Sequence, residues 1–548
     1  MNNHKKKRDI SFIHKIINKD LKKKYEKNIH TRFPPDPNGY LHLGHAKSLY
    51  INFEIAKHYQ GKCNLRFDDT NPNKKNSKYI KSIKQDILWL GYKWNKHVKY
   101  ASMYFKKIYK YAVELIKKNL AYVDKLKKTD IRTFRGTLNK PGINSPYRNQ
   151  TIEENMTLFE NMKYGNIQEG MACLRAKIDM KSPIIIMRDP VLYRIKFNEH
   201  HKTNHQWCIY PTYDFAHCIS DAIEGITHSL CTLEFQDNRV LYKWILDNLN
   251  ILKQPQQYEY SRLNIEHMIL SKRKLGLLIK KKIINNWDDP RMPTISGLRR
   301  RGYTANSILN FCKNLGITKQ DNLIEMSSLE SCIRKELDST SYRTMGILDP
   351  ITISITNINE EYEESIQILN HPKNHSMGFR KIIFNNMIYI DRSDFQENPK
   401  KNYYRLKIGG TVKLKYSYTI TANSIEKDCD NNITKIFCTC NFQKNHNKDH
   451  GIIHWISKKQ AKKCELRIYS YIFNDKNPNI KKNFLSNINN ESKIIYNGFI
   501  NKEIQKSSPV NTYQLERIGY FKIDNQISTN KNIILHQIVS LKENKKNK

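Results

Sequence analysis

The sequence predicts an α/β fold with a nucleotide site, interrupted by an α+β insertion and followed by a helical region and an all-β region. A short strand near residues 28–33 is followed by a loop with three Pro and two Gly and then by a helix near 45–59, as in nucleotide-binding α/β units. This alternation stops near residue 103 and resumes near Tyr213. After Asp349, short alternating segments such as TVKLKYSYTITA are typical of β-barrels or sandwiches.

The length and charge of the chain favour a multidomain protein that meets a polyanion. At about 100 to 200 residues per domain, 548 residues predict roughly three to five domains. The net charge of +42, from 94 Lys and Arg against 52 Asp and Glu, attracts nucleic acid. A genome rich in A and T would also enrich Lys, Asn and Ile without selection for binding. The charge alone therefore favours RNA only weakly.

The cysteines and apolar runs indicate a cytoplasmic protein. None of the 11 Cys forms a C-x-x-C pair, and the nearest approach, Cys438-Thr-Cys440, matches zinc spacing poorly. No apolar run approaches the roughly 18 to 20 residues that cross a bilayer. The basic start has no apolar segment after its charges. We expect reduced thiols, no zinc and no membrane partner.

The predicted elements follow in order along the chain. The first 30 residues indicate an amphipathic basic helix. A second strand, 63–67, ends in Asp68 and Asp69, and a helix at 80–90 follows. Carboxyl ends of parallel strands are where such sheets bind ligands. The insertion opens with a helix at 104–120, and helical patterns dominate from about 263 to 340.

A first motif for phosphate chemistry is the string PPDPNGYLHLGH, which ends at His45. Gly44 leaves room for a nucleotide against the backbone, and the following helix points its N–H groups at an anion. His42 and His45 can both donate to a phosphate whose negative charge grows when it is attacked. The competing interpretation is two unrelated surface histidines beside a tight turn.

A second motif, Ile-Leu-Ser-Lys-Arg-Lys at 269–274, lies more than 200 residues further on. Its hydroxyl and ammonium groups could close over a triphosphate and neutralise the leaving pyrophosphate. Such a run alone is most often an exposed basic turn. Its order after the first motif favours the functional interpretation.

The two strings resemble the His-Ile-Gly-His and Lys-Met-Ser-Lys-Ser signatures of class I aminoacyl-tRNA synthetases. Longer strings are similar to the bacterial glutaminyl-tRNA synthetase family, among them TRFPPDPNGYLHLGHAKSLYINF, CLRAKIDM and WDDPRMPTISGLRRRGYT. The similarity extends from about residue 10 to about residue 540. Asp36 stands where the family usually has Glu and Leu270 where it usually has Met. Both keep charge or apolar volume, so we expect altered tuning of ATP binding without its loss.

The resemblance implies a site for ATP and one for glutamine. Its catalytic residues would be His42, His45 and Lys272, and glutamine would be held by Asp68 and Tyr213. An aspartate at a strand end can bind the ammonium of the substrate, and a phenol can address its polar side chain. The alternatives are a helix cap for Asp68 and a packed core aromatic for Tyr213. The implied ATP-binding residues are Asp36, Pro37, Asn38, His42, Leu43, Gly44, His45, Ala46, Lys47, Ser48, Thr232, Arg262, Leu263, Leu270, Ser271 and Lys272.

Two further positions concern the choice between glutamine and glutamate. A site for glutamate has to compensate a buried carboxylate, typically with Arg, because an unpaired buried charge is unfavourable. The position that resembles the specificity wall of the family pocket is the neutral Cys231. Gln257 stands where the glutaminyl family also has Gln. Both favour the amide.

Four residues resemble family positions that meet RNA. Leu138, in the turn FRGTLNKPG, resembles an apolar wedge that opens the last base pair of the acceptor stem. Asp237 could accept hydrogen bonds from exocyclic amines in a groove. Arg343 and Arg405 resemble residues that meet the anticodon, although lone arginines are usually only solvated.

The implied architecture is a Rossmann-type catalytic domain in two halves, with further domains between and after them. The partners implied are ATP with Mg²⁺, glutamine and tRNA(Gln), for a monomeric enzyme. Glutamine would attack the α-phosphate of ATP, and the terminal ribose 2′-hydroxyl of the RNA would then take the acyl group. The predicted segments are 1–102 and 213–262 (catalytic), 103–212 (acceptor-stem-binding α+β insertion), 263–340 (helical connector) and 341–548 (two anticodon-binding β-barrels).

Three other interpretations share part of this pattern. A glutamyl-tRNA synthetase with β-barrel anticodon domains has the same plan, but Cys231 argues against it. A small nucleotidylyltransferase with the same loop does not need a long β-rich RNA-binding region. A noncatalytic RNA-binding relative would have no reason to keep both phosphate motifs together with Asp68 and Tyr213.

Overall fold

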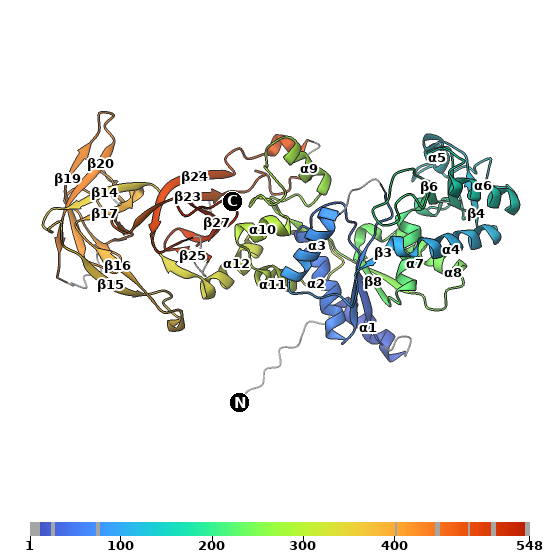
Figure 1. Cartoon of the computed structure of the whole chain (residues 1–548), viewed down its shortest axis with the longest axis horizontal. Helices are drawn as coiled ribbons and strands as arrows, with labels where there is room; N and C mark the ends of the chain where they lie inside the picture. The colour runs from blue at the N-terminus through green and yellow to red at the C-terminus, as the bar shows by residue number, and fades with distance from the viewer. Residues whose placement is uncertain are drawn as a thin grey trace. The chain divides into compact units, whose positions relative to one another are not determined.

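The computed structural model describes residues 11–23, 28–72, 77–400, 403–443, 450–480, 483–505 and 511–542. The chain forms two compact units (Figure 1). The first contains residues up to Asn264 together with Cys312–Leu323, and the second contains Ile265–Phe311 and the chain from Ile324 onwards. The predicted domain boundaries divide the chain more finely than this and stay predictions.

The first unit is built on a parallel sheet. Three strands pair in the order β1-β2-β3, and β8 pairs with β9 in parallel. The backbone N–H of Thr227, just before β8, donates to the carbonyl of His30 in β1 at 2.9 Å, so the second pair lies beside the first three strands. Parallel neighbours need crossover connections, which helices supply here. The strands are β1 (His30–Phe33), β2 (Lys62–Phe67), β3 (Lys99–Tyr100), β8 (His228–Thr232) and β9 (Gln256–Tyr260).

The helices of this core follow their strands directly. Helix α2 (Leu43–His58) links β1 to β2, and α3 (Ser77–Trp89) links β2 to β3. Helices α7 (Tyr213–Ile223) and α8 (Asn238–Asn248) flank β8. The predicted first helix spans Phe12–Lys22 as α1, with Ser11 as its N-cap and its apolar face buried. Residues 1–10 and 24–27 of that prediction lie outside the described residues.

The predicted α+β insertion is an antiparallel sheet of order β4-β5-β6-β7 with three helices, and it shares one apolar core with side chains of α7 and α8. Figure 1 shows it in teal beside α7 and α8. The reciprocal capping box of Thr151 and Glu154 and the left-handed Gly165 delimit its last helix. The elements are α4 (Phe105–Lys117), β4 (Ala121–Asp124), α5 (Lys128–Arg135), α6 (Ile152–Tyr164), β5 (Cys173–Ala176), β6 (Val191–Ile195) and β7 (Ile209–Pro211).

The second unit joins a helical part to two large sheets. Helix α11 and the short strands β10 and β11 contain residues of both units. The described helices and short strands of this connecting region are β10 (Asn264–Ile265), α9 (Lys272–Lys280), α10 (Ile295–Arg301), α11 (Ala305–Leu315), β11 (Leu323–Ile324) and α12 (Met326–Thr340).

The two sheets of the second unit each contain seven described strands, curl strongly and draw on segments far apart in the sequence. One has the order β12-β25-β26-β27-β23-β24-β13, and its strands are β12 (Tyr342–Thr344), β13 (Gly346–Ile347), β23 (Ala461–Tyr469), β24 (Lys493–Asn501), β25 (Thr512–Leu515), β26 (Gly519–Ile523) and β27 (Ile533–Ser540). The other has the order β21-β18-β19-β20-β14-β17-β22, and its strands are β14 (Pro350–Ile355), β17 (Met387–Asp391), β18 (Thr411–Leu414), β19 (Thr419–Lys427), β20 (Ile433–Asn441), β21 (Ile452–Ile453) and β22 (Ile456–Ser457). Beside them stands the hairpin of β15 (Glu364–Leu369) and β16 (Phe379–Phe384).

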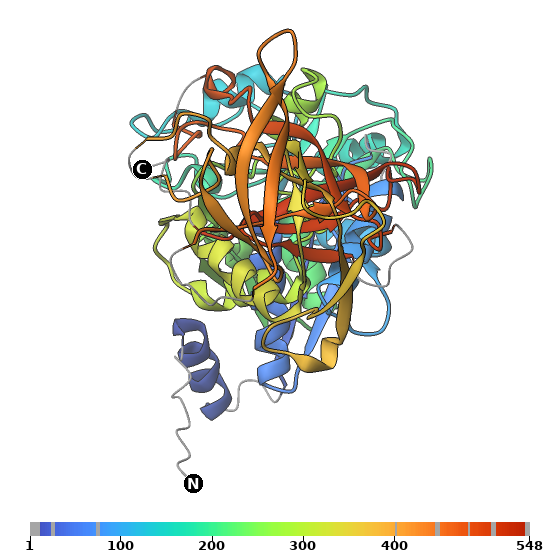
Figure 2. The ribbon, with the colours of Figure 1, turned by 90° about the vertical axis from the view of Figure 1, so that its left-hand side faces the viewer.

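Alternation of buried and exposed residues explains these sheets. In β14 every second side chain is buried, and the strand places three isoleucines in the core. Cys438 and Cys440 are both buried on one face of β20, as the spacing of two predicts. Figure 2 shows the long hairpin of β19 and β20 in orange. None of the 11 cysteines, all of which lie within the described residues, forms a disulfide. Among the described helices, none has the length and apolar character of a membrane span.

Candidate functional site

His42 and His45 lie together at the start of α2. His42 is the N-cap, and its backbone N–H donates to Nδ1 of His45 at 3.0 Å. Because Nδ1 of His45 accepts, the proton of a neutral His45 ring is on Nε2, which is then a donor. The two rings have centroids 3.8 Å apart. Two imidazoles at a helix N-terminus thus form a site suited to an anion.

The rest of this loop is held by short-range and long-range contacts. The side-chain amide of Asn38 donates to the carboxylate of Asp36, and its backbone N–H donates to the carbonyl of Asp36 at 2.8 Å. Lys47, predicted to bind ATP, is buried, and its Nζ donates to the carbonyl and hydroxyl of Ser261 at 2.7 and 3.1 Å. Burial lowers the pKa of Lys47. In this structure Lys47 therefore ties α2 to the segment around Ser261.

Thr232 and Arg262, far apart in the sequence, meet at one carboxylate. Arg262 contacts Glu234 at 3.0 Å, and the Thr232 hydroxyl donates to the other oxygen of Glu234 at 3.3 Å. Leu263 next to Arg262 is buried. Glu234 was not predicted from the sequence, because nothing in its immediate neighbourhood marks it.

Leu270, Ser271 and Lys272 belong to the second unit. Ser271 is the N-cap of α9 and Lys272 is its first residue. The helix is anchored in a hydrophobic cluster that includes Leu275, Ile472 and Phe473. The two halves of the predicted phosphate site therefore lie in different units, and their meeting stays a prediction.

Asp68, at the end of β2, offers one carboxylate oxygen to a ligand. Its Oδ1 accepts from Arg66 Nε at 2.8 Å. Its Oδ2 is buried and makes no hydrogen bond among the described residues, with His217 Nδ1 3.5 Å away. Burial alone would raise the pKa of Asp68, but Arg66 and His217 hold it below its ordinary value. A buried, ionised oxygen without a donor is a fitting site for a substrate cation.

Two buried arginines support Asp68 from behind. Arg66 also contacts Asp221 at 2.7 Å, and Arg32 contacts the same Asp221 at 3.1 Å. Nη2 of Arg32 also lies 2.8 Å from Nε2 of the His217 ring. Burial would raise the pKa of Asp221, but Arg32 and His217 keep it far below its ordinary value. Sequence reasoning missed this network, although a single Arg inside the buried strands HTRF and CNLRF was the available signal.

Next to Asp68 lies a small cavity into which Tyr213, Cys231 and Gln257 all face. Its volume of about 10 Å³ suits about one water molecule. Burial raises the pKa of Cys231 to about 12 and that of Tyr213 well above its ordinary value, so both groups are neutral. The cavity is lined by Tyr213, Asp214, His217, Cys231, Phe235, Asn238, Tyr242 and Gln257.

Gln257 has a fixed orientation in this wall. Its Nε2 donates to the carbonyl of Phe235 at 2.9 Å and to Glu259 at 3.0 Å. Both amide hydrogens are thus engaged, which leaves the carbonyl oxygen as the group that Gln257 can offer to a ligand. The buried charge of Glu259 is compensated by Arg239 at 3.2 Å.

Leu138 is 78% exposed at the tip of a turn in the inserted domain. Gly136 occupies the left-handed region at φ 74°, and Thr137 and Lys140 close the turn by two backbone hydrogen bonds. The buried Arg188 donates from Nη1 to the carbonyls of Arg135, Thr137 and Lys140 at 2.8 to 2.9 Å. An exposed leucine is thus presented on a rigid support. Asp237 is exposed at the N-terminus of α8.

Arg343 and Arg405, both in the second unit, have different surroundings. Arg343 is buried, pairs with Asp338 at 2.7 Å, and its Nη1 makes no hydrogen bond among the described residues. Arg405 is exposed and pairs at 2.8 Å with Asp394, which Arg517 also binds through both oxygens. Each arginine is held by one carboxylate.

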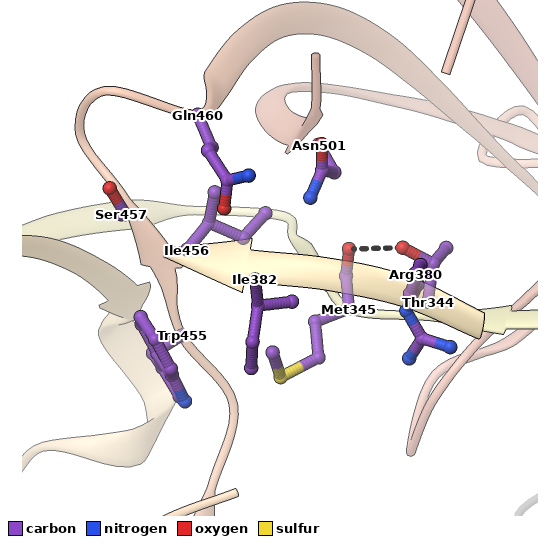
Figure 3. A pocket seen from close by; sticks show the side chains of 9 residues that line it. All are labelled: Thr344, Met345, Arg380, Ile382, Trp455, Ile456, Ser457, Gln460 and Asn501. Atoms are coloured by element: carbon purple, nitrogen blue, oxygen red, sulfur yellow. Dashed lines mark hydrogen bonds between the residues drawn. The ribbon is translucent and has the colours of Figure 1, made fainter. Parts of the chain in front are cut away.

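The second unit also contains two hollows. The first, beside Thr344, has about 10 Å³, room for about one water molecule, and Figure 3 shows the apolar side chains of Met345, Ile382 and Trp455 together with the amides of Gln460 and Asn501 around it. The second is larger, about 450 Å³, and was missed by sequence reasoning. It is lined by Glu364, Ile366, Lys413, Lys415, Tyr416, Ser417, Tyr418, Thr419, Gln443 and Ile452.

Comparison with known proteins finds matches along nearly the whole chain. Residues 28–339 match the family described as tRNA synthetases class I (E and Q), catalytic domain. Residues 341–441 and 452–524 match two anti-codon binding domains of the same class. A glutamine–tRNA ligase of Buchnera aphidicola subsp. Acyrthosiphon pisum (strain Tuc7) is 58% identical, covering 99% of this chain and 97% of that protein. The glutamine–tRNA ligase of Yersinia enterocolitica is 54% identical over 98% of each chain.

Proposed function

The chain belongs to the class I aminoacyl-tRNA synthetases of the E and Q type, and from this premise we propose that it is a glutamine–tRNA ligase. In this reaction the carboxylate of glutamine attacks the α-phosphate of Mg-ATP, which gives glutaminyl-adenylate and pyrophosphate. The terminal ribose 2′-hydroxyl of tRNA(Gln) then takes the acyl group and releases AMP. We also propose that the enzyme acts as a cytoplasmic monomer.

The observation that carries the proposal is the cavity with the neutral side chains of Tyr213, Cys231 and Gln257, beside the unpartnered oxygen of Asp68. Asp68 Oδ2 binds the α-ammonium of the substrate in place of water. The side chain then lies toward the cavity, where Tyr213 donates from its phenol and Gln257 accepts at its carbonyl oxygen. The side-chain amide of glutamine has an oxygen that accepts from Tyr213 and N–H groups that donate to Gln257. The side-chain carboxylate of glutamate would instead place its negative charge beside the carbonyl oxygen of Gln257.

Phosphate chemistry takes place at the start of α2. Nε2–H of His45 and the helix N-terminus stabilise charge that develops on the α-phosphate. His42 contributes a second imidazole, and Lys272 neutralises the leaving pyrophosphate. No protein side chain becomes covalently attached, so positioning and electrostatics supply the rate.

Residues of both units bind the RNA. Leu138, on its rigid turn, stacks against the end of the acceptor stem, and the exposed carboxylate of Asp237 accepts from base amines. In the second unit, Arg343, Arg405 and the large hollow with its lysines and tyrosines contact the anticodon. Aromatic rings and cations of this kind stack on unpaired bases and bind phosphates.

The test is aminoacylation of purified tRNA(Gln) with labelled glutamine and, separately, labelled glutamate. We expect charging with glutamine, with a specificity constant at least about 100-fold above that for glutamate. Preferential charging with glutamate would identify the chain as a glutamyl-tRNA synthetase. Absence of both charging and RNA-dependent pyrophosphate exchange would contradict any ligase activity.

The turn that carries Leu138 gives a further prediction. Arg188→Gln is expected to lower kcat/KM for charging of tRNA(Gln) by about tenfold, because three carbonyls lose their common donor and the wedge is no longer held in place. The measurement is aminoacylation with glutamine.

The control for this prediction is an RNA in which the first acceptor pair is mismatched. Such an RNA is already open, so the loss in the Arg188 variant should shrink to about twofold or less. Leu138→Ala should behave like Arg188→Gln on both RNAs. Leu252→Ala, which alters another exposed leucine, should leave charging unchanged. A loss of equal size on both RNAs would contradict the wedge.

A further inference from the structure

A second carboxylate, Asp69, stands directly after the substrate-binding Asp68 and is enclosed by donors. Its Oδ1 accepts from the backbone N–H of Ser102 at 2.9 Å. Its Oδ2 accepts from the Ser102 hydroxyl at 2.7 Å and from His201 Nε2 at 2.9 Å. Its backbone carbonyl accepts from His200 Nε2 at 2.7 Å. Side chain and main chain of Asp69 are thus both restrained.

The same three residues, Asp69, His200 and His201, have the composition of a metal site, with ligand atoms within 4.8 Å of one another. The hydrogen bonds of His200 argue against a metal. Its Nδ1 accepts from the backbone N–H groups of Lys202 and Thr203 at 3.2 and 3.3 Å, so the proton is on Nε2. A metal at Nε2 would move that proton to Nδ1, against two N–H donors. Burial lowers the pKa of His200, which agrees with a neutral ring already used at both nitrogens.

The donors come from two different parts of the first unit. Ser102 lies in the short 3₁₀ segment Ala101–Tyr104 after β3. His200 and His201 lie in the connection between β6 and β7 of the inserted sheet. On the other side, the backbone N–H of Asp68 donates at 3.3 Å to the carbonyl of Pro35. Pro35 belongs to the motif PPDPNGYLHLGH, here called the phosphate loop. The dipeptide of Asp68 and Asp69 is therefore fixed between the phosphate loop and the inserted domain.

We propose that His200 and His201 are positioning residues for the amino-acid substrate: they hold Asp69, and through the shared backbone they hold the free oxygen of Asp68 toward the substrate ammonium. This inference rests on the proposed function. It assigns to the connection between β6 and β7 an effect on amino-acid binding that acts through Asp69, in a domain otherwise expected to serve RNA. The effect should fall on KM for glutamine and not on ATP.

The test compares two substitutions of similar size. His201→Leu removes the donor to Asp69 Oδ2, whereas His201→Gln keeps an N–H donor in its place. We expect His201→Leu to raise KM for glutamine by about tenfold while kcat and KM for ATP stay within about threefold. His201→Gln should restore KM to within about threefold of the wild type. His205→Ala, an exposed histidine of the same connection, should leave all three constants unchanged.

Several other results of these measurements would overturn the proposal. Equal loss of kcat and of affinity for both substrates, without rescue by Gln, would overturn the proposal in favour of a general structural role. If His201→Leu does not fold, Ser102→Ala removes the other donor to Oδ2 and should raise KM for glutamine in the same way; an unchanged KM there would overturn the proposal. Activity that falls on treatment of the wild type with a zinc chelator would overturn it in favour of a metal. Wild-type charging of glutamine, measured in parallel, tests the proposed function independently of these variants.

Discussion

Substitution of Lys272 by Ala is expected to lower kcat of glutamine activation by about 100-fold or more, equivalent to about 3 kcal/mol of transition-state stabilisation. The ammonium meets pyrophosphate mainly when its charge develops, so removal should affect kcat and leave KM for glutamine nearly unchanged. Position supports the assignment, because Lys272 is the first residue of α9 directly after its N-cap Ser271. The measurement is pyrophosphate exchange in the presence of tRNA(Gln).

A lysine at the other end of the same helix provides the control. Lys280 is the last residue of α9 and is exposed, so Lys280→Ala removes an equal charge from the helix without reaching the phosphates. Its turnover should stay within about twofold of the wild type. Turnover of the Lys272 variant within a few-fold of the wild type would show that this loop has no role in catalysis.

The local pattern of the chain predicts its elements well. The strand expected at 63–67 is β2 at Lys62–Phe67, and the alternating segments after Asp349 form the two large sheets. The helix expected from 45 begins at Leu43, because the backbone N–H of His42 is capped by the ring of His45. A cap made by an imidazole lies outside the usual Ser, Thr, Asp and Asn signal, so the sequence pattern placed the helix start two residues late.

The parts of the candidate site that lie within one motif could be predicted from the sequence. The parts formed by side chains that are far apart in the sequence could not. His42 and His45 are neighbours in the sequence, and the structure brings them together at one helix end. The buried Lys47, by contrast, donates to Ser261 across 214 positions, and Asp69 meets His201 across 132. Such pairings depend on the packed fold, and no periodicity or spacing encodes them.

The remaining prediction concerns the choice of amino acid. Cys231→Arg is expected to move the ratio of specificity constants for glutamine and glutamate by about 100-fold toward glutamate. The wild-type wall holds a neutral thiol, since burial raises the pKa of Cys231 to about 12. A guanidinium there leaves an amide without compensation for the new charge and offers a carboxylate a bidentate partner.

The surroundings of Cys231 decide how far this change can go. Glu259, whose charge acts on Cys231, could capture the new guanidinium, but Arg239 and Gln257 already bind it. The fixed carbonyl of Gln257 still opposes a substrate carboxylate, so efficient use of glutamate requires a change at Gln257 as well, because the wall acts as a unit. Cys231→Ser, neutral and of similar size, should keep the ratio of the wild type. The ratio is measured with the same tRNA(Gln) for all variants. A ratio that does not move toward glutamate in Cys231→Arg would show that this side chain does not face the substrate. The neutral thiol of Cys231 would then no longer explain why the site selects glutamine.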